Sequence, residues 1–175
     1  MINSASSQNI EYDNFLKNKH TLQIDEFKFK CCIGKKGLTN NKKEGDKKTP
    51  RGIFEIENLY FREDRIKKPS TLLKCVKIRK NMGWCDDVRF PKKYNKLFKI
   101  EKKIKHEKLK RKDYKYDLLI PIKYNFRKPI TGLGSCIFIH LTKDYKPTNG
   151  CIALVKKDLL IMLRLIKKNS KIKIF

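Results

Sequence analysis

The stretch of residues 137–154, IFIHLTKDYKPTNGCIAL, places a histidine and a cysteine on two apolar segments that a short polar loop joins. A thiol attacks a carbonyl carbon as the thiolate, so a cysteine that forms acyl intermediates needs an imidazole beside it. His140 and Cys151 are eleven positions apart, and residues at the ends of adjacent strands can meet in space. We therefore predict that Cys151 is a nucleophile and that His140 is its base.

Gly150 and Thr148 extend this pattern within the polar loop. Glycine lets the backbone approach a substrate closely and adopt conformations that are closed to other residues. A pair of donors for a developing oxyanion often requires such a backbone. The Thr148 hydroxyl either bonds to its own turn or holds the cysteine loop in place.

Three blocks of the chain resemble, in order, the YkuD-type L,D-transpeptidase catalytic domain. Residues 140–151 resemble the family signature of His, then Ser or Thr, any residue, Gly and Cys. Residues 44–54, EGDKKTPRGIF, look like its Gly-Asp…Thr-Pro-x-Gly-x-Phe segment. Residues 83–87, GWCDD, together with the pair YN at 94–95, resemble one branch of the family. The resemblance spans about residues 28–175.

Two positions depart from the family pattern. Leu141 stands where a glycine commonly follows the histidine, and Ala153 stands where an arginine is often found two places after the cysteine. These departures concern substrate contacts more than the nucleophile.

The resemblance implies a mainly β fold, an L,D-transpeptidase catalytic-domain-like β-sandwich with one or two packing helices. It also implies acyl transfer on peptidoglycan stem peptides without a cofactor or metal. Cys151 would attack the carbonyl of an L-centred diaminopimelate residue, release the terminal D-alanine, and hold the peptide as a thioester. His140 would manage the protons, the main chain of Leu141 would orient the imidazole, and the amides of Gly150 and Cys151 would stabilise the oxyanion.

By resemblance alone, eight further residues are candidates for substrate binding. They are Trp84, Asp86, Asp87, Tyr94, Asn95, Tyr60, Arg62 and Arg65.

The reaction outcome stays open at this point. An L,D-carboxypeptidase or endopeptidase would use the same thioester and pass the acyl group to water instead of to a second stem. The sequence does not separate these activities from transpeptidation.

The length of 175 residues suits one domain. Residues 1–18 are polar and lack a hydrophobic period, so we expect a flexible arm followed by the catalytic domain at 19–175. No apolar run is long enough for a membrane span, and no secretion signal is visible at the N-terminus. The resemblance nevertheless implies a periplasmic or cell-wall location in a bacterium, where we expect a monomer.

The net charge of +26 raises the alternative of a nucleic-acid-binding module. Only eight of the 44 basic residues are arginine, however, and the guanidinium fork is what phosphate and base-edge recognition favours. We expect no nucleic-acid partner and interpret the lysine runs as solvated faces. Such faces would also attract anionic cell-wall polymers.

Apolar patterning predicts several strands and one helix. Strands are expected at 27–33, 53–59, 73–78, 118–122, 136–141 and 170–175, and a packing helix at 156–168. The charged segment 91–116 is expected to be an irregular or partly helical insertion, either a lid over the cleft or a solvated loop.

The six cysteines form no Cys-x-x-Cys pair, so neither a disulfide framework nor a metal site is indicated. Cys31 and Cys136 lie in apolar runs and are expected to be small buried side chains. Cys85 is a candidate for the cleft lining.

Overall fold

The computed structural model describes residues 20–24, 27–167 and 169–174. The expected N-terminal arm, residues 1–18, lies outside the described residues. In chain order the elements are β1 (His20–Ile24), β2 (Phe27–Cys31), β3 (Leu38–Thr39), β4 (Thr49–Pro50), β5 (Gly52–Glu55), β6 (Leu59–Phe61), β7 (Cys75–Lys77), β8 (Met82–Cys85), β9 (Leu97–Lys99), β10 (His106–Lys108), β11 (Leu118–Pro121), β12 (Phe138–Thr142), β13 (Ile152–Val155), α1 (Lys156–Leu165) and β14 (Lys171–Ile174).

The central sheet has the strand order β13-β12-β11-β6-β7 and carries the most apolar runs of the chain. Every residue of β11 and β12 is buried, as expected for strands covered on both faces. β12 pairs with β11 antiparallel and with β13 in parallel. The connection from β12 to β13 is shorter than the dozen or more residues usual for a parallel pair, and it forms the polar loop of the sequence motif.

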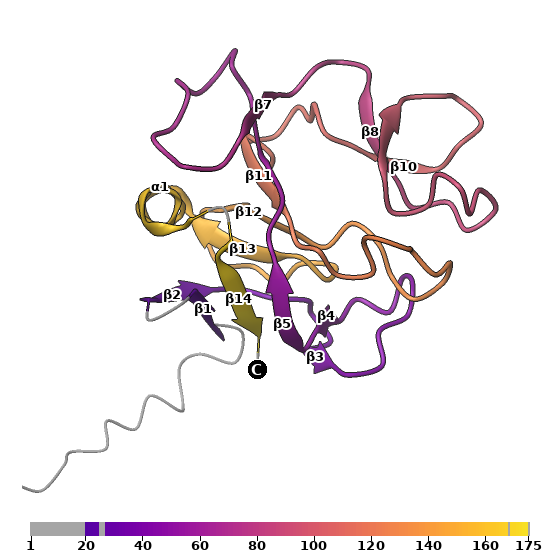
Figure 1. The fold of residues 1–175 in the computed structure, drawn as a ribbon, viewed down its shortest axis with the longest axis horizontal. Coiled ribbons are helices and arrows are strands. Elements are labelled where there is room, and N and C mark those ends of the chain that lie inside the picture. The colour runs from indigo at the N-terminus through magenta and orange to yellow at the C-terminus, as the bar shows by residue number, and fades with distance from the viewer. Residues whose placement is uncertain (1–19, 25–26, 168, 175) are drawn as a thin grey trace, which may run out of the picture.

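The second large sheet has the order β2-β1-β14-β5 and lies below the central sheet in Figure 1. β14 alternates between exposed and buried residues, so one of its faces packs inward and the other meets solvent. Side chains from both sheets form one hydrophobic core, to which Phe29 and Ile172 contribute from one sheet and Ile139 and Leu154 from the other. The mainly β, sandwich-type fold expected from the sequence is confirmed.

The helix α1 packs at one side of this sandwich (Figure 1). Leu159, Met162 and Leu163 are its buried residues, and their spacing puts them on one helical face. Asp158 in the first turn and Arg164 in the last turn complement the helix dipole. The predicted helix is confirmed, although it ends three residues earlier than expected.

The segment 91–116 differs from the expectation of an irregular or partly helical insertion. Among the described residues it contains β9 and β10, which flank β8 in a three-stranded antiparallel sheet on the side away from α1 (Figure 1). Alternation is hard to see in this segment because each strand is only three residues long. Its inner face holds a second apolar cluster, in which Trp84 and Leu109 pack with Phe138 of the central sheet.

The two large sheets are joined where residues 32–35 run beside the motif loop. Cys32 and Ala153 exchange two backbone hydrogen bonds of 2.9 Å, and Gly34 forms a bridge with Thr148. A β-carbon on Gly34 would lie 2.5 Å from the Lys47 carbonyl oxygen. This crossing therefore leaves room for glycine alone.

We predict that Gly34→Ala lowers the free energy of unfolding by about 1–3 kcal/mol, because the backbone it meets has to shift. Gly37→Asn is the control, since its β-carbon would meet nothing within 4 Å and asparagine tolerates the positive φ of 78°. Urea unfolding followed by circular dichroism measures both. Equal stabilities for Gly34→Ala and the wild-type protein would contradict the close crossing.

Candidate active site

His140 and Cys151 line one cavity of about 610 Å³. His140 lies at the centre of β12, and Cys151 directly precedes β13. The parallel register pairs His140 with Ala153, two residues beyond the cysteine. Strand pairing therefore brings the two predicted residues to the same cavity wall.

The imidazole of His140 is buried and held by its own strand. Its Nδ1 lies 3.0 Å from the carbonyl oxygen of Leu141. Because a carbonyl only accepts hydrogen bonds, Nδ1 carries the proton and Nε2 is left as an acceptor. Burial lowers the pKa of His140 to about 4. The hydrogen bond to Leu141 raises this pKa, whereas the positive charges of Lys115 and Arg111 lower it further. The ring is thus neutral at pH 7.

The thiol of Cys151 is also uncharged in this arrangement. Its Sγ donates a hydrogen bond to the carbonyl oxygen of Cys136 at 3.1 Å. Burial raises the pKa of Cys151 to about 12, against a backbone hydrogen bond from Phe138 that favours the thiolate. A neutral thiol and a neutral imidazole therefore share the cavity, and the thiol needs a base when it reacts.

Hydrogen bonds from Thr148 fix the loop that carries the thiol. Its hydroxyl donates to the Cys151 carbonyl at 2.6 Å and accepts from the Gly150 amide at 3.1 Å. Its backbone amide donates to the Ile33 carbonyl at 2.8 Å. Both hydroxyl contacts stay within residues 148–151, so Thr148 bonds to its own turn, and that turn is the one that carries Cys151.

The amide of Gly150 is consequently occupied in this structure. The Cys151 amide, by contrast, makes no hydrogen bond within the described part of the chain. Of the two predicted oxyanion donors, Cys151 N–H is the free one.

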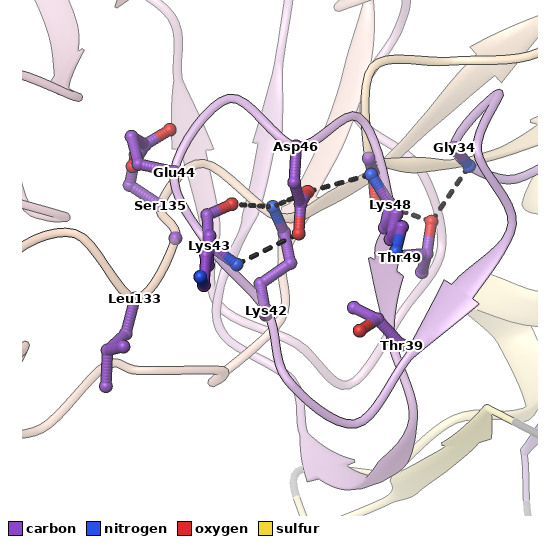
Figure 2. A network of polar contacts seen from close by, with 12 residues as sticks. Gly34, Thr39, Lys42, Lys43, Glu44, Asp46, Lys48, Thr49, Leu133 and Ser135 are labelled. Carbon is purple, nitrogen blue, oxygen red and sulfur yellow. Dashed lines mark hydrogen bonds and ion pairs between the residues drawn. The ribbon is translucent and has the colours of Figure 1, made fainter.

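Thr49, from the Thr-Pro block, holds the same loop from the other side. Its fully buried hydroxyl donates to the Gly150 carbonyl at 2.7 Å and accepts from the Gly34 amide at 2.9 Å. The turn that leads to Thr49 is closed by Asp46, whose carboxylate accepts from the amides of Lys43 and Lys48 (Figure 2). The Gly-Asp…Thr-Pro segment is thus a support for the cysteine loop.

Four residues of this turn line the cavity, namely Lys42, Glu44, Gly45 and Lys47. Lys42 is buried, and its ammonium bonds to Asp46 at 2.6 Å. Glu44 accepts from the hydroxyls of Tyr94 and Ser135, and Figure 2 shows its carboxylate beside Ser135. Both residues line the cavity, and the sequence analysis did not single them out.

Of the eight residues expected to bind substrate, Asp86 lies on the cavity wall. One carboxylate oxygen pairs with Lys105 at 3.0 Å, and the other is buried without a hydrogen-bond partner among the described residues. Cys85, the neighbouring candidate for the cleft lining, is fully buried and does not line this cavity, so that expectation is wrong.

Trp84 and Asn95 act on the cavity indirectly. The indole N–H of Trp84 and the backbone amide of Cys136 both donate to Asn95 Oδ1, at 2.9 and 3.1 Å. Cys136 has a positive φ of 54°, and its carbonyl accepts the Cys151 thiol. The Gly-Trp and Tyr-Asn blocks therefore position the peptide that holds the thiol.

The remaining candidates make structural contacts and do not themselves line the cavity. Asp87 accepts from Arg89, Tyr94 donates to Glu44, and Tyr60 packs edge-on against Trp84.

Two arginines of the same group hold the C-terminal end of the insertion. Arg62 bonds to Asp64 and to the Arg111 carbonyl, and Arg65 bonds to Asp117. Neither arginine lines the cavity.

The cavity wall that the sequence analysis missed comes mainly from the end of the insertion. Glu107 accepts from Arg111 at 2.7 Å, and the Arg111 guanidinium lies 4.9 Å from the ring centre of Tyr116. Tyr116 in turn packs edge-on against His140, with 5.4 Å between ring centres. The sequence analysis considered this segment as a lid over the cleft. It did not identify the individual cavity residues, because their charges resemble those of any solvated loop.

All six cysteines are free. Cys31 is buried as predicted, whereas Cys136 is partly exposed on the cavity wall. No group of three or more His, Cys, Asp or Glu side chains that could hold a metal occurs among the described residues. Within the same residues, no helix has the length and apolar character needed to cross a membrane.

We predict that Thr49→Val lowers the free energy of unfolding by about 2–4 kcal/mol, because it leaves a buried amide and a buried carbonyl without a partner. The matched control is Thr39→Val, whose hydroxyl accepts one exposed amide, from Asn41. Urea unfolding measures the stabilities, and alkylation of Cys151 reports on the loop. Equal losses in the two variants would contradict the supporting role of Thr49.

In a comparison with protein families, one family model matches nearly the whole chain. The model of the L,D-transpeptidase catalytic domain, YkuD, matches residues 5–174. Neither the comparison with curated proteins nor the one with solved structures gives a match. The chain belongs to the L,D-transpeptidase catalytic domain family.

Proposed function

We propose that the protein is a cysteine-dependent acyltransferase that acts on peptidoglycan stem peptides, with Cys151 as nucleophile and His140 as base. The observation that carries this proposal is the neutral imidazole of His140, fixed through Nδ1 on the Leu141 carbonyl, in the cavity of a free thiol. A base that is unprotonated and oriented is what a thiol of high pKa requires.

In the first step, the Cys151 sulfur adds to the carbonyl carbon of the diaminopimelate residue while its proton passes to Nε2 of His140. The tetrahedral intermediate then collapses, the bond to the terminal D-alanine breaks, and His140 returns the proton to the leaving amine. A side-chain amine of a second stem attacks the thioester in the same way. The Cys151 amide is free to stabilise the oxyanion.

Charges on the cavity wall support a peptide that carries both amines and carboxylates. Lys42 and Lys115 supply cationic groups, and Asp86 and Glu107 supply anionic ones. Arg111 does not replace the arginine that is missing at Ala153, since it is already paired with Glu107 and Asp113.

We also propose that the protein is located where its peptidoglycan substrate is found. It would work as a monomer in the periplasm or at the cell wall, and its lysine-rich surface would attract anionic wall polymers. Transfer of the same acyl group to water, as in an L,D-carboxypeptidase, remains the second outcome of this thioester.

We predict that a carbapenem acylates the wild-type protein once, at Cys151, and that Cys151→Ala prevents the adduct. Intact-mass spectrometry with peptide mapping measures this, and Cys32→Ala serves as a control for another thiol. With a disaccharide tetrapeptide as donor, 3→3 dimers identify a transpeptidase, whereas tripeptide alone identifies a carboxypeptidase. A folded protein that gives neither adduct nor product would refute the proposed function.

We also predict that the acylation rate is flat from about pH 5 to pH 7.5 and falls as the pH drops through about 4. The lowered pKa means that His140 stays unprotonated, and able to act as a base, until that range. Short incubations at each pH, with folding checked by circular dichroism, give the profile. Half of the maximal rate near pH 6.5 would instead indicate an unperturbed imidazole.

A further inference from the structure

A second cavity, of about 930 Å³, lies where the loop between β7 and β8 meets the end of β10 and the chain that follows it. Its wall is strongly basic. The cationic lining residues are Lys80, Lys108, Lys110, Arg111 and Lys112, and the acidic one is Asp113. We call this cavity, defined by these six residues, the basic groove.

Three lysines of the basic groove are available to a ligand. Lys80, Lys108 and Lys112 are exposed and form no ion pair within the part of the chain that the structure describes. Lys110 and Arg111, in contrast, are already paired with carboxylates of the protein. The groove therefore has a surplus of positive charge, which makes it complementary to an anionic partner.

The basic groove adjoins the catalytic cavity, because Arg111 lines both. On the catalytic side, its guanidinium lies over the ring of Tyr116, which in turn packs against His140. On the other side, Lys110 and Lys112 flank it in the chain and line the groove. A polymer that reaches the catalytic cavity with one of its units can therefore place a neighbouring unit in the groove.

The chemistry of the groove favours separate carboxylates as ligands. A lysine ammonium is a compact point charge that bonds single oxygen atoms, whereas base-edge and bidentate phosphate recognition use the fork of a guanidinium. The guanidinium of the groove, that of Arg111, is occupied by Glu107 and Asp113. Peptidoglycan stem peptides carry several free carboxylates each, on diaminopimelate and at the C-terminus, and they recur along every strand of the polymer.

We propose that the basic groove is an accessory substrate site, which binds the carboxylates of one stem peptide while another stem of the same polymer occupies the catalytic cavity. The proposal rests on the peptidoglycan-directed function and deepens it, since it assigns a second contact with the same substrate. Two linked contacts raise the effective concentration of the polymer at Cys151 without any change in the catalytic cavity. A soluble fragment with a single stem gains nothing from the groove.

The test compares purified sacculi, freed of attached phosphate polymers, with a soluble disaccharide tetrapeptide. The variant combines Lys80→Gln, Lys108→Gln and Lys112→Gln, which removes three charges and keeps most of each side chain. We expect roughly 10-fold weaker binding to sacculi in co-sedimentation at low salt, and a similar loss in the rate of their conversion. The rates of carbapenem acylation and of tetrapeptide conversion should stay at the wild-type values.

The matched control combines Lys28→Gln, Lys157→Gln and Lys171→Gln, because these lysines are exposed on β2, α1 and β14, and their loss lowers the net charge by the same amount. It should bind sacculi nearly as well as the wild-type protein. Equal binding by the two triple variants would overturn the proposal, because overall charge alone would then matter.

Two further results would also overturn it. Slower conversion of the soluble tetrapeptide in the groove variant would place the effect in the catalytic cavity. Groove-dependent binding of a DNA duplex, without binding of sacculi, would assign the groove to nucleic acid instead. A wild-type protein that forms neither a carbapenem adduct nor product would refute the proposed function, whereas co-sedimentation with sacculi tests the groove independently of that result.

Discussion

The parallel pairing of β12 with β13 is the constraint on which the site depends. It places the buried imidazole of His140 beside the start of the strand that follows Cys151. The short connection between these strands is held by hydrogen bonds of the Thr148 hydroxyl within it and by contacts from outside. Thr148 bonds to Ile33 and Thr49 bonds to Gly150, at the point where the two sheets meet. The same contacts therefore join the two sheets and position the Cys151 thiol.

This arrangement favours a particular chemical state. The Leu141 carbonyl fixes one tautomer of His140, and burial keeps the ring neutral. Burial also keeps the Cys151 thiol protonated, on the Cys136 carbonyl. Burial disfavours both the thiolate of Cys151 and the imidazolium of His140. The proton would therefore pass from the thiol to the imidazole only as the substrate carbonyl is attacked. Charge would then appear on the substrate oxygen, where a donor such as the Cys151 amide can stabilise it.

The sequence predicted the buried strands and the packing helix because continuous apolar runs and helical spacing are local signals. It also predicted that His140 and Cys151 would meet, since both flank such runs. It failed for the segment 91–116, whose strands are short and carry lysines outward. The contact of Asn95 with Cys136, 41 positions away, leaves no local pattern. The same holds for the contact between the rings of Tyr116 and His140, which depends on tertiary packing alone.

Nitrogen NMR of His140 tests the neutral thiol–imidazole pair most directly. Chemical shifts of the two ring nitrogens distinguish the imidazolium from each neutral tautomer, and a titration gives the pKa. We expect a neutral ring protonated at Nδ1 at pH 7, with protonation of Nε2 only near pH 4. An imidazolium at pH 7 that becomes neutral in Cys151→Ala would instead reveal a resting ion pair of thiolate and imidazolium.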